Sequence, residues 1–90
     1  MKYRKLGNSG IEVSVIGLGT WELGNDFFGE VDEAEGIKAI QKSIDLGINL
    51  IDTAPGYGQN FEAETAVGKA LKGRRDKAVI STKCGIHRIK

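Results

Sequence analysis

The stretch that decides the fold runs Ile48-Asn49-Leu50-Ile51-Asp52-Thr53-Ala54-Pro55-Gly56-Tyr57-Gly58. It begins as a short run of leucine and β-branched residues, which is typical of a buried strand. The run ends in a carboxylate, Asp52, and breaks at once into a Pro-Gly turn that carries Tyr57. A carboxylate at the tip of a buried strand is costly unless a positive group meets it. The stretch therefore predicts a strand whose end needs a cationic partner.

That partner is expected one strand–helix–strand unit later, at Lys83. Residues 78–83 are Ala-Val-Ile-Ser-Thr-Lys, a second short apolar run that predicts a strand ending in a lysine. Neighbouring strands of a sheet lie about 4.8 Å apart. We therefore expect Asp52 and Lys83 to face each other across one edge of a sheet. Tyr57 would lie on the loop above them, which gives a site for proton transfer.

Turn residues delimit the first elements of the chain. Residues 3–6 and 11–15 flank a Gly-Asn-Ser-Gly turn, which predicts a β-hairpin. Residues 15–19 form a further apolar run and are predicted to be the first buried strand. Residues 22–31, which contain a Gly-Asn-Asp turn, are predicted to form a loop.

Two helices are predicted by apolar residues that recur every three or four positions. The first begins at Asp32, which can cap it, and ends at Gly47, which is free to take a positive φ angle. The second follows residue 60 and closes at Gly73. The apolar stripe of the first helix is Ile37, Ile40 and Ile44, and that of the second is Ala63, Ala66, Val67, Ala70 and Leu71.

The order hairpin, strand, helix, strand, helix, strand predicts an α/β chain with parallel strands. Because strand–helix–strand units are right-handed, the C-terminal ends of the strands meet at one rim, where ligands bind in α/β folds. Thr20-Trp21, Asp52, Tyr57 and Lys83 all follow the ends of predicted strands. The topology thus predicts one shared site.

Composition restricts the classes of partner and compartment. The 90 residues have a formal net charge of +1, and no basic block precedes the tail, which argues against nucleic acid as the main partner. No apolar run approaches the roughly 20 residues that cross a membrane, and none behind Met1 predicts a signal peptide. The single cysteine, Cys84, suits a reducing cytoplasm and is expected to be buried. One histidine, His87, does not make a metal site.

Ordinary structural roles stay open beside the functional ones. Asp52 could cap a turn, Tyr57 could pack on the surface, and Lys83 could be solvated. The run Gly17-Leu18-Gly19-Thr20-Trp21 lacks the third glycine of a dinucleotide fingerprint, and a loop rather than a helix is predicted to follow it. Its glycines could admit a ligand to the backbone or fit a tight turn. Trp21 could line a pocket or join the core.

Four segments of the chain resemble the amino-terminal part of an aldo-keto reductase, in the family's order and spacing. They are residues 17–21 (Gly-Leu-Gly-Thr-Trp), 51–58 (Ile-Asp-Thr-Ala-Pro-Gly-Tyr-Gly), 64–71 (Glu-Thr-Ala-Val-Gly-Lys-Ala-Leu) and 80–83 (Ile-Ser-Thr-Lys). The resemblance implies a (β/α)8 TIM barrel that is closed below by the hairpin. Residues 1–15 would form the hairpin, and residues 16–90 the first two β-α units plus the third strand.

The resemblance also implies an activity, the reduction of aldehydes or ketones to alcohols. The reductant would be NADPH, with NADH not excluded, bound at the C-terminal rim. Asp52, Tyr57 and Lys83 match three members of the family's catalytic tetrad, in which tyrosine is the proton donor. The positions that match the cofactor side are Gly19, Thr20, Trp21 and Asp52, and those that match the substrate pocket are Trp21 and Tyr57.

The chain departs from the family pattern in three places. The fourth catalytic residue is a histidine at the end of the fourth strand, beyond these 90 residues, and His87 is too close to Lys83 to match it. The phosphate-binding loops after the seventh and eighth strands are also missing, and Ala63-Glu64 replaces the usual Ser-Glu pair. We therefore expect a fragment that is inactive alone and that self-associates or needs the rest of the barrel. The alternative is a non-catalytic, cofactor-binding regulatory subunit of the same fold.

Overall fold

The computed structural model describes residues 1–24, 32–58 and 60–84. In chain order, the elements are β1 (Tyr3–Lys5), β2 (Glu12–Ser14), β3 (Gly17–Gly19), the 3-10 helix η1 (Trp21–Gly24), α1 (Glu33–Asp45), β4 (Leu50–Asp52), α2 (Glu62–Ala70), the 3-10 helix η2 (Arg75–Lys77) and β5 (Val79–Ser81). The predicted alternation of strands and helices is confirmed.

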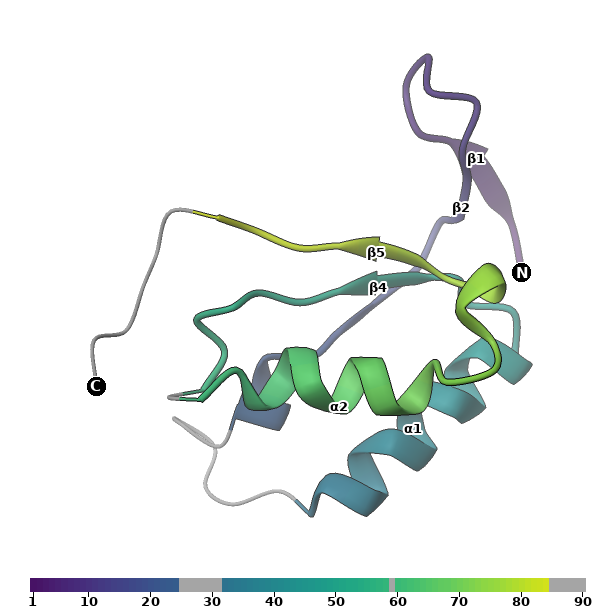
Figure 1. Cartoon of the computed structure of the whole chain (residues 1–90). Coiled ribbons are helices and arrows are strands. Elements are labelled where there is room, and N and C mark those ends of the chain that lie inside the picture. Colours follow the sequence, from purple (N-terminus) through teal and green to yellow (C-terminus); the bar gives the residue numbers. More distant parts are fainter. Residues whose placement is uncertain (25–31, 59, 85–90) are drawn as a thin grey trace.

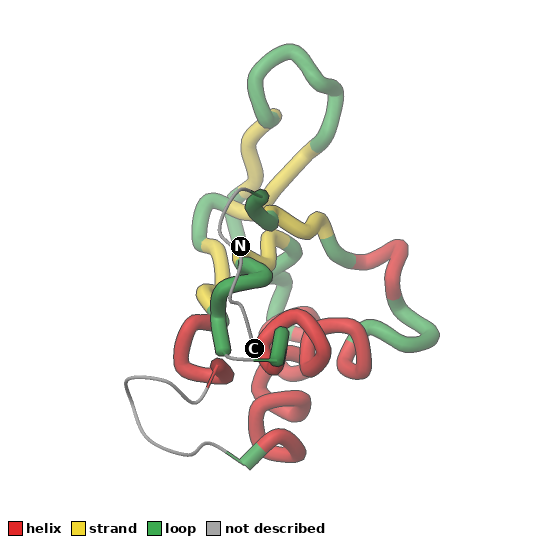
Figure 2. Tube along the Cα trace, turned by 60° about the vertical axis from the view of Figure 1, so that its left-hand side comes forward, coloured by secondary structure: helices red, strands yellow, loops and turns green. Residues whose placement is uncertain are grey.

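The strands form two sheets. Strands β1 and β2 pair antiparallel as the predicted hairpin, and β3, β4 and β5 form a parallel sheet with β4 in the centre. Both helices lie on the same side of β4 and β5, and the hairpin stands at the end of the sheet where β4 and β5 begin (Figure 1). In Figure 2, turned by 60°, the hairpin loop again extends well away from the helices. The opposite end of the sheet, where the strands finish, is therefore free of the hairpin.

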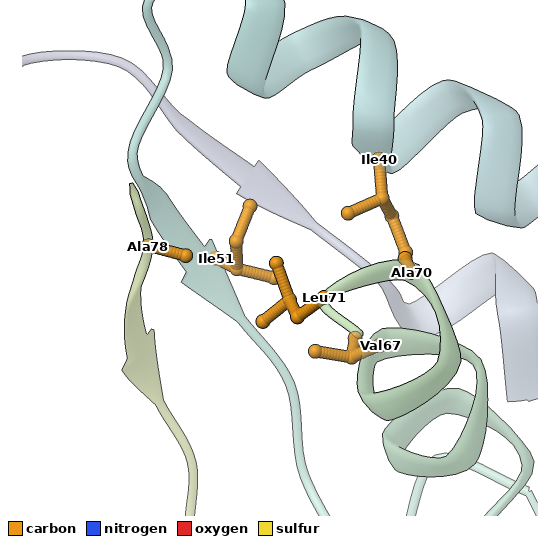
Figure 3. Close-up of a cluster of buried hydrophobic side chains, with 6 residues drawn as sticks. All are labelled: Ile40, Ile51, Val67, Ala70, Leu71 and Ala78. Atoms are coloured by element: carbon orange, nitrogen blue, oxygen red, sulfur yellow. The ribbon is translucent and has the colours of Figure 1, made fainter. Parts of the chain in front are cut away.

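The core lies between the parallel sheet and the helices. Leu18, Ile51 and Ile80 are paired in register across the three strands, so their side chains share one face of the sheet. Ile51 is fully buried beneath α1 and α2. The cluster around it is drawn in Figure 3 and consists of Ile40, Ile51, Val67, Ala70, Leu71 and Ala78. Because alternate residues of β4 point to opposite faces, Leu50 and Asp52 turn away from this core.

Helix α1 begins and ends where the sequence predicts. The Asp32 carboxylate accepts a hydrogen bond from the Ala34 amide at 3.0 Å and so caps the first turn. At the other end, Gly47 adopts a φ of 103°, and its amide donates to the Ile44 carbonyl. The Ile48 amide donates to the carbonyl of Ser43, which completes the paired bonds of a Schellman motif. The glycine therefore turns the chain directly from α1 into β4.

The hairpin is tied to the sheet through Asn49. The Ser14 amide donates to Asn49 Oδ1 at 2.6 Å, and the Asn49 amide donates to Ser14 Oγ at 3.1 Å. Asn49 Nδ2 donates in turn to the carbonyl of Glu12 at 3.0 Å. A further bond runs from the Tyr3 hydroxyl to the carbonyl of Gly47. The start of β4 is thus fixed against the base of the hairpin.

Two predictions for residues 15–31 were wrong in part. A buried strand over 15–19 was predicted, but β3 spans only Gly17–Gly19, and Val15 and Ile16 remain 50% and 57% exposed. The reason is that the chain bends at these two residues as it leaves the hairpin. The predicted loop begins instead as the 3-10 helix η1. Residues 25–31 of that loop lie outside the described residues.

Candidate active site

Lys83 and Asp52 meet at the end of the parallel sheet. Lys83 Nζ lies 3.1 Å from Asp52 Oδ1 and donates a second hydrogen bond, of 3.0 Å, to the carbonyl of Thr53. The sheet register explains this, because Asp52 pairs with Ser81 and the Thr53 amide donates to the Ser81 carbonyl. The segment after β5 is therefore held beside the end of β4. The spatial relationship predicted from strand spacing is found in the structure.

Tyr57 joins this pair from the loop that follows β4. Its ring centroid lies 5.1 Å from Lys83 Nζ, within the range of a cation–π contact. The loop is closed by a hydrogen bond from the Tyr57 amide to the Ala54 carbonyl. The amide of Ala63, at the start of α2, donates to the Tyr57 carbonyl. The tyrosine is thus fixed at both its amide and its carbonyl.

Trp21 forms the neighbouring wall of the site. Its ring centroid lies 6.5 Å from that of Tyr57, with the two rings tilted by 38°. Trp21 is the first residue of η1 and is 43% exposed. The Leu23 side chain, which belongs to η1, lies against Gly36 of α1, where an added Cβ atom would collide with it. The absence of a side chain at Gly36 therefore leaves room for Leu23, which follows Trp21 by two positions in η1.

Thr20 links β3 to the acid-bearing end of β4. Its amide and its hydroxyl both donate to the carbonyl of Asp52, at 3.1 and 3.0 Å. The side chain is 1% exposed, so its hydroxyl is occupied in holding two strands together. Gly19 is exposed, and a Cβ built there would meet no atom within 4 Å. Of the four positions predicted on the cofactor side, Gly19 is open to approach and Thr20 supports a third, Asp52.

A cavity of about 250 Å³ opens in front of these residues. Its lining consists of Trp21, Ala54, Pro55, Gly56, Tyr57, Lys83 and Cys84. Cys84 was predicted to be buried, which is wrong: the thiol is exposed, because β5 ends at Ser81 and the next residues leave the sheet. The turn residues 54–56 also line the cavity and were not predicted as site residues. Their position in the sequence between Asp52 and Tyr57 could have indicated this.

The electrostatics of the site favour a charged lysine. The hydrogen bond that Lys83 donates to Asp52 is the largest influence and raises the pKa of Lys83 above its ordinary value of 10.5; partial burial opposes it, and the nearby Tyr57 adds a smaller increase. The side chains of Lys83 and Asp52 remain 49% and 44% exposed. An ion pair this accessible to water contributes at most about 1 kcal/mol to stability. The pair therefore orients the ammonium more than it stabilises the fold.

The donor set at this rim suits a nicotinamide cofactor. Trp21, Tyr57 and Lys83 line one mostly apolar cavity, and the Asp52 carboxylate contacts Lys83. Across residues 1–24, 32–58 and 60–84, no three His, Cys, Asp or Glu side chains gather to hold a metal ion. His87 lies outside the described residues.

No helix in the described part of the chain is long and apolar enough to cross a bilayer.

Comparison with known proteins identifies the family. Residues 15–90 match the model of the Aldo/keto reductase family, and the chain belongs to that family. It is 47% identical over 90 residues to the NADH-specific methylglyoxal reductase of Escherichia coli (strain K12), covering 96% of this chain and 27% of that protein. The chain spans about a quarter of the length of the curated relatives it matches.

Solved structures of the same family confirm the fold. An aldo-keto reductase from Pseudomonas aeruginosa superposes with a TM-score of 0.82 at 41% identity, covering 98% of this chain and 33% of that one. An aldo/keto reductase from Klebsiella pneumoniae, solved in complex with NADP and acetate, gives a TM-score of 0.71 at 37% identity, covering 81% and 24%. The hairpin, parallel sheet and two helices are thus the amino-terminal portion of a TIM barrel.

Proposed function

We propose that this chain supplies the acid, the phenol and the ammonium of a site that reduces aldehydes or ketones to alcohols. The observation that supports this most directly is the position of Lys83 Nζ, 3.1 Å from Asp52 Oδ1 and 5.1 Å from the centre of the Tyr57 ring. Lys83 and Tyr57 line the same cavity and Asp52 contacts Lys83, an arrangement that neither a fully solvated lysine nor a turn-capping aspartate requires. The three side chains form a proton-transfer group.

Each member of the group has a distinct role. Tyr57 donates its phenolic proton to the oxygen of the bound carbonyl and recovers it in the reverse direction. Lys83 stabilises the phenolate left behind, because its ammonium lies over the tyrosine ring and stays charged at neutral pH. Asp52 keeps that ammonium charged and directed. The nicotinamide cofactor, when bound, supplies the hydride that this chain cannot provide.

Gly19, Thr20, Trp21 and Asp52 are the proposed residues on the cofactor side of the site. Trp21 and Tyr57 are also the proposed walls for a small carbonyl substrate, since both line the cavity. NADPH is the proposed reductant, supported by the NADP complex of the Klebsiella pneumoniae relative. NADH stays the second candidate, because the Escherichia coli relative is named as NADH-specific.

The organisation of the protein is proposed on the same basis. Residues 1–15 form the closing hairpin, and residues 16–90 form two β-α units and a third strand of a barrel that needs about 250 residues. In the described part of the chain, β3 and β5 each pair with β4 alone, so both outer edges of the sheet are open. We therefore propose that the isolated chain self-associates or pairs with the rest of a barrel, and that it lacks turnover alone. A cytoplasmic location is proposed from the single cysteine.

The test is turnover by the full-length protein that contains these residues, compared with its Tyr57→Phe variant. A panel of small aldehydes and ketones is supplied with NADPH and, separately, NADH, and cofactor oxidation is followed by absorbance. Removing the proton donor should lower kcat by about 100-fold or more. Tyr3→Phe is the matched control, since it removes a phenol that bonds to Gly47 in the hairpin region.

Two outcomes would overturn the proposal. Equal turnover by the wild type and Tyr57→Phe would remove the tyrosine from the chemistry. Cofactor binding with no turnover on any carbonyl would indicate the regulatory subunit instead. The isolated 90-residue chain, examined by light scattering and the same assay, tests the proposal that it associates and is inactive alone.

A further inference from the structure

Helix α2 is joined to the end of β5 by one short hydrogen bond. The Thr82 hydroxyl donates to Glu64 Oε2 at 2.6 Å. Glu64 belongs to the first turn of α2, and Thr82 lies between Ser81, the last residue of β5, and Lys83. An O–H···O⁻ bond of this length is of the charge-assisted kind, about twice as strong as a neutral one. A charged helix residue thus holds the residue next to the site lysine.

The segment that carries Lys83 has few other restraints in the described part of the chain. The last sheet bond on this side runs from the Thr53 amide to the Ser81 carbonyl. Beyond it, Lys83 reaches back to Asp52 and Thr53 through its long side chain alone. Residues 81–84 are exposed. The backbone between the last sheet bond and the lysine therefore depends on the Thr82–Glu64 contact for its direction.

We propose that Glu64 and Thr82 are positioning residues that fix the end of β5 so that the Lys83 ammonium is directed at Asp52 and Tyr57. The contact joins α2 to the strand end on one side of the segment, while Asp52 and Thr53 hold the lysine on the other. Misplacement of a catalytic group by about 1 Å can cost up to 100-fold in rate, so a restraint this close matters. The kinetic part of the inference rests on the proposed function; the structural part does not.

The effect is geometric rather than electrostatic. The groups that raise the pKa of Lys83 are Asp52 and Tyr57, and the Glu64 carboxylate is not among them. Glu64 acts on the lysine through the backbone of Thr82. A glutamine at position 64 keeps a hydrogen-bond acceptor and loses the charge, whereas an alanine loses both. The two substitutions therefore separate the bond from the charge.

The experiment compares Thr82→Val and Glu64→Ala, which delete the bond from opposite sides, in the full-length protein. Thr82→Ser keeps the donor and should behave like the wild type, and Glu64→Gln keeps a neutral acceptor and should lose clearly less than Glu64→Ala. Thr65→Val is the matched control, because Thr65 is exposed on α2 one position from Glu64. One readout is kcat and KM for a carbonyl turned over by the wild type. The other is the pKa of Lys83, followed by NMR of its side-chain carbon.

We expect Thr82→Val and Glu64→Ala each to lower kcat by about threefold to tenfold with KM unchanged, as loss of an interaction that orients the reacting groups requires. The pKa of Lys83 should fall toward its ordinary value of 10.5 in both variants. The double variant should be no worse than either single one, since both remove the same bond.

Wild-type kinetics and an unchanged Lys83 pKa in both deletion variants would overturn the inference. A fall in Glu64→Gln as large as in Glu64→Ala would also contradict it, since that would assign the effect to charge. If the wild type turns over no carbonyl, the proposed function fails, and the NMR measurement still decides whether the contact positions Lys83. If Tyr57→Phe abolishes turnover while Thr82→Val changes neither readout, only the positioning inference fails.

Discussion

Lys83 and Asp52 are 31 positions apart in the chain, yet their charged atoms lie 3.1 Å from each other. The contact closes the gap between two neighbouring strand ends rather than between two layers of the core. Its members are about half exposed, so its free energy is small. The contact orients the Lys83 ammonium beside the Tyr57 ring.

The pH dependence of stability tests this pair. A group whose pKa is raised in the folded state contributes stability below its unfolded value, and the contribution is lost as the pH rises through the folded value. For Lys83, the contribution is therefore complete at neutral pH and is lost above its ordinary value of 10.5. We expect Asp52→Asn to flatten the stability profile on that alkaline side alone. Urea unfolding of both proteins from neutral to strongly alkaline pH measures it, and identical profiles would contradict the assignment.

A side chain at position 36 should require the Leu23 side chain to move. A Cβ at position 36 would collide with the Leu23 side chain, so Gly36→Ala should destabilise the fold by about 1–3 kcal/mol and displace Trp21. Gly68→Ala is the matched control, because nothing lies within 4 Å of the added Cβ in α2, and it should stabilise by about 0.5–1 kcal/mol. Thermal unfolding and tryptophan fluorescence measure both. Partial recovery in Gly36→Ala with Leu23→Ala would identify the clash as the cause.

Two buried threonines should respond to valine in opposite ways. Thr20 and Thr53 are each 1% exposed, but only the Thr20 hydroxyl has a partner, the carbonyl of Asp52. Thr53 Oγ1 is buried without a hydrogen bond in the described structure. Thr20→Val should therefore cost about 1 kcal/mol, whereas Thr53→Val should be neutral or stabilising. Chemical denaturation decides, and a loss in Thr53→Val as large as in Thr20→Val would show that its hydroxyl is satisfied.

Asn49→Ala should loosen the hairpin from the sheet. The substitution removes the bonds to the Ser14 amide and the Glu12 carbonyl, for an expected loss of about 1–3 kcal/mol. Asn8→Ala, in the exposed hairpin turn, is the control and should stay within about 0.5 kcal/mol of the wild type. Hydrogen exchange should show faster opening of β2 in Asn49→Ala. Unchanged protection there would place the hairpin's stability elsewhere.

Local signals explain why much of the fold could be predicted from the sequence. The bounds of α1 follow from the Asp32 cap and the positive φ of Gly47, both of which depend on neighbouring residues. The burial of Ile51 beside an outward Asp52 follows from strand alternation. Parallel pairing then brings the ends of β4 and β5, and with them Asp52 and the segment of Lys83, to the same rim.

The remaining features depend on contacts that leave no local pattern. Val15 and Ile16 are apolar and β-branched, yet they lie at a bend and stay exposed. Cys84 follows a strand but extends past its paired end. The bond between Thr82 and Glu64 joins residues 18 positions apart across an edge that only the folded sheet defines. Residue type alone predicts none of these three outcomes.

The shortness of β4 has a consequence for how the protein can fail. Asn49, at the hairpin end, and Asp52, at the site end, are separated by three positions, or about 10 Å of extended chain. A slip of one residue in pairing would turn Asp52 toward the helices and Ile51 to the opposite face of the sheet, since side chains alternate. A shifted register of β4 would not keep both the contacts of Asn49 with the hairpin and the contact of Asp52 with Lys83. The hydrogen bonds between the hairpin and Asn49 therefore help to set the register of β4, and a chain paired in the wrong register would lose the contact between Asp52 and Lys83.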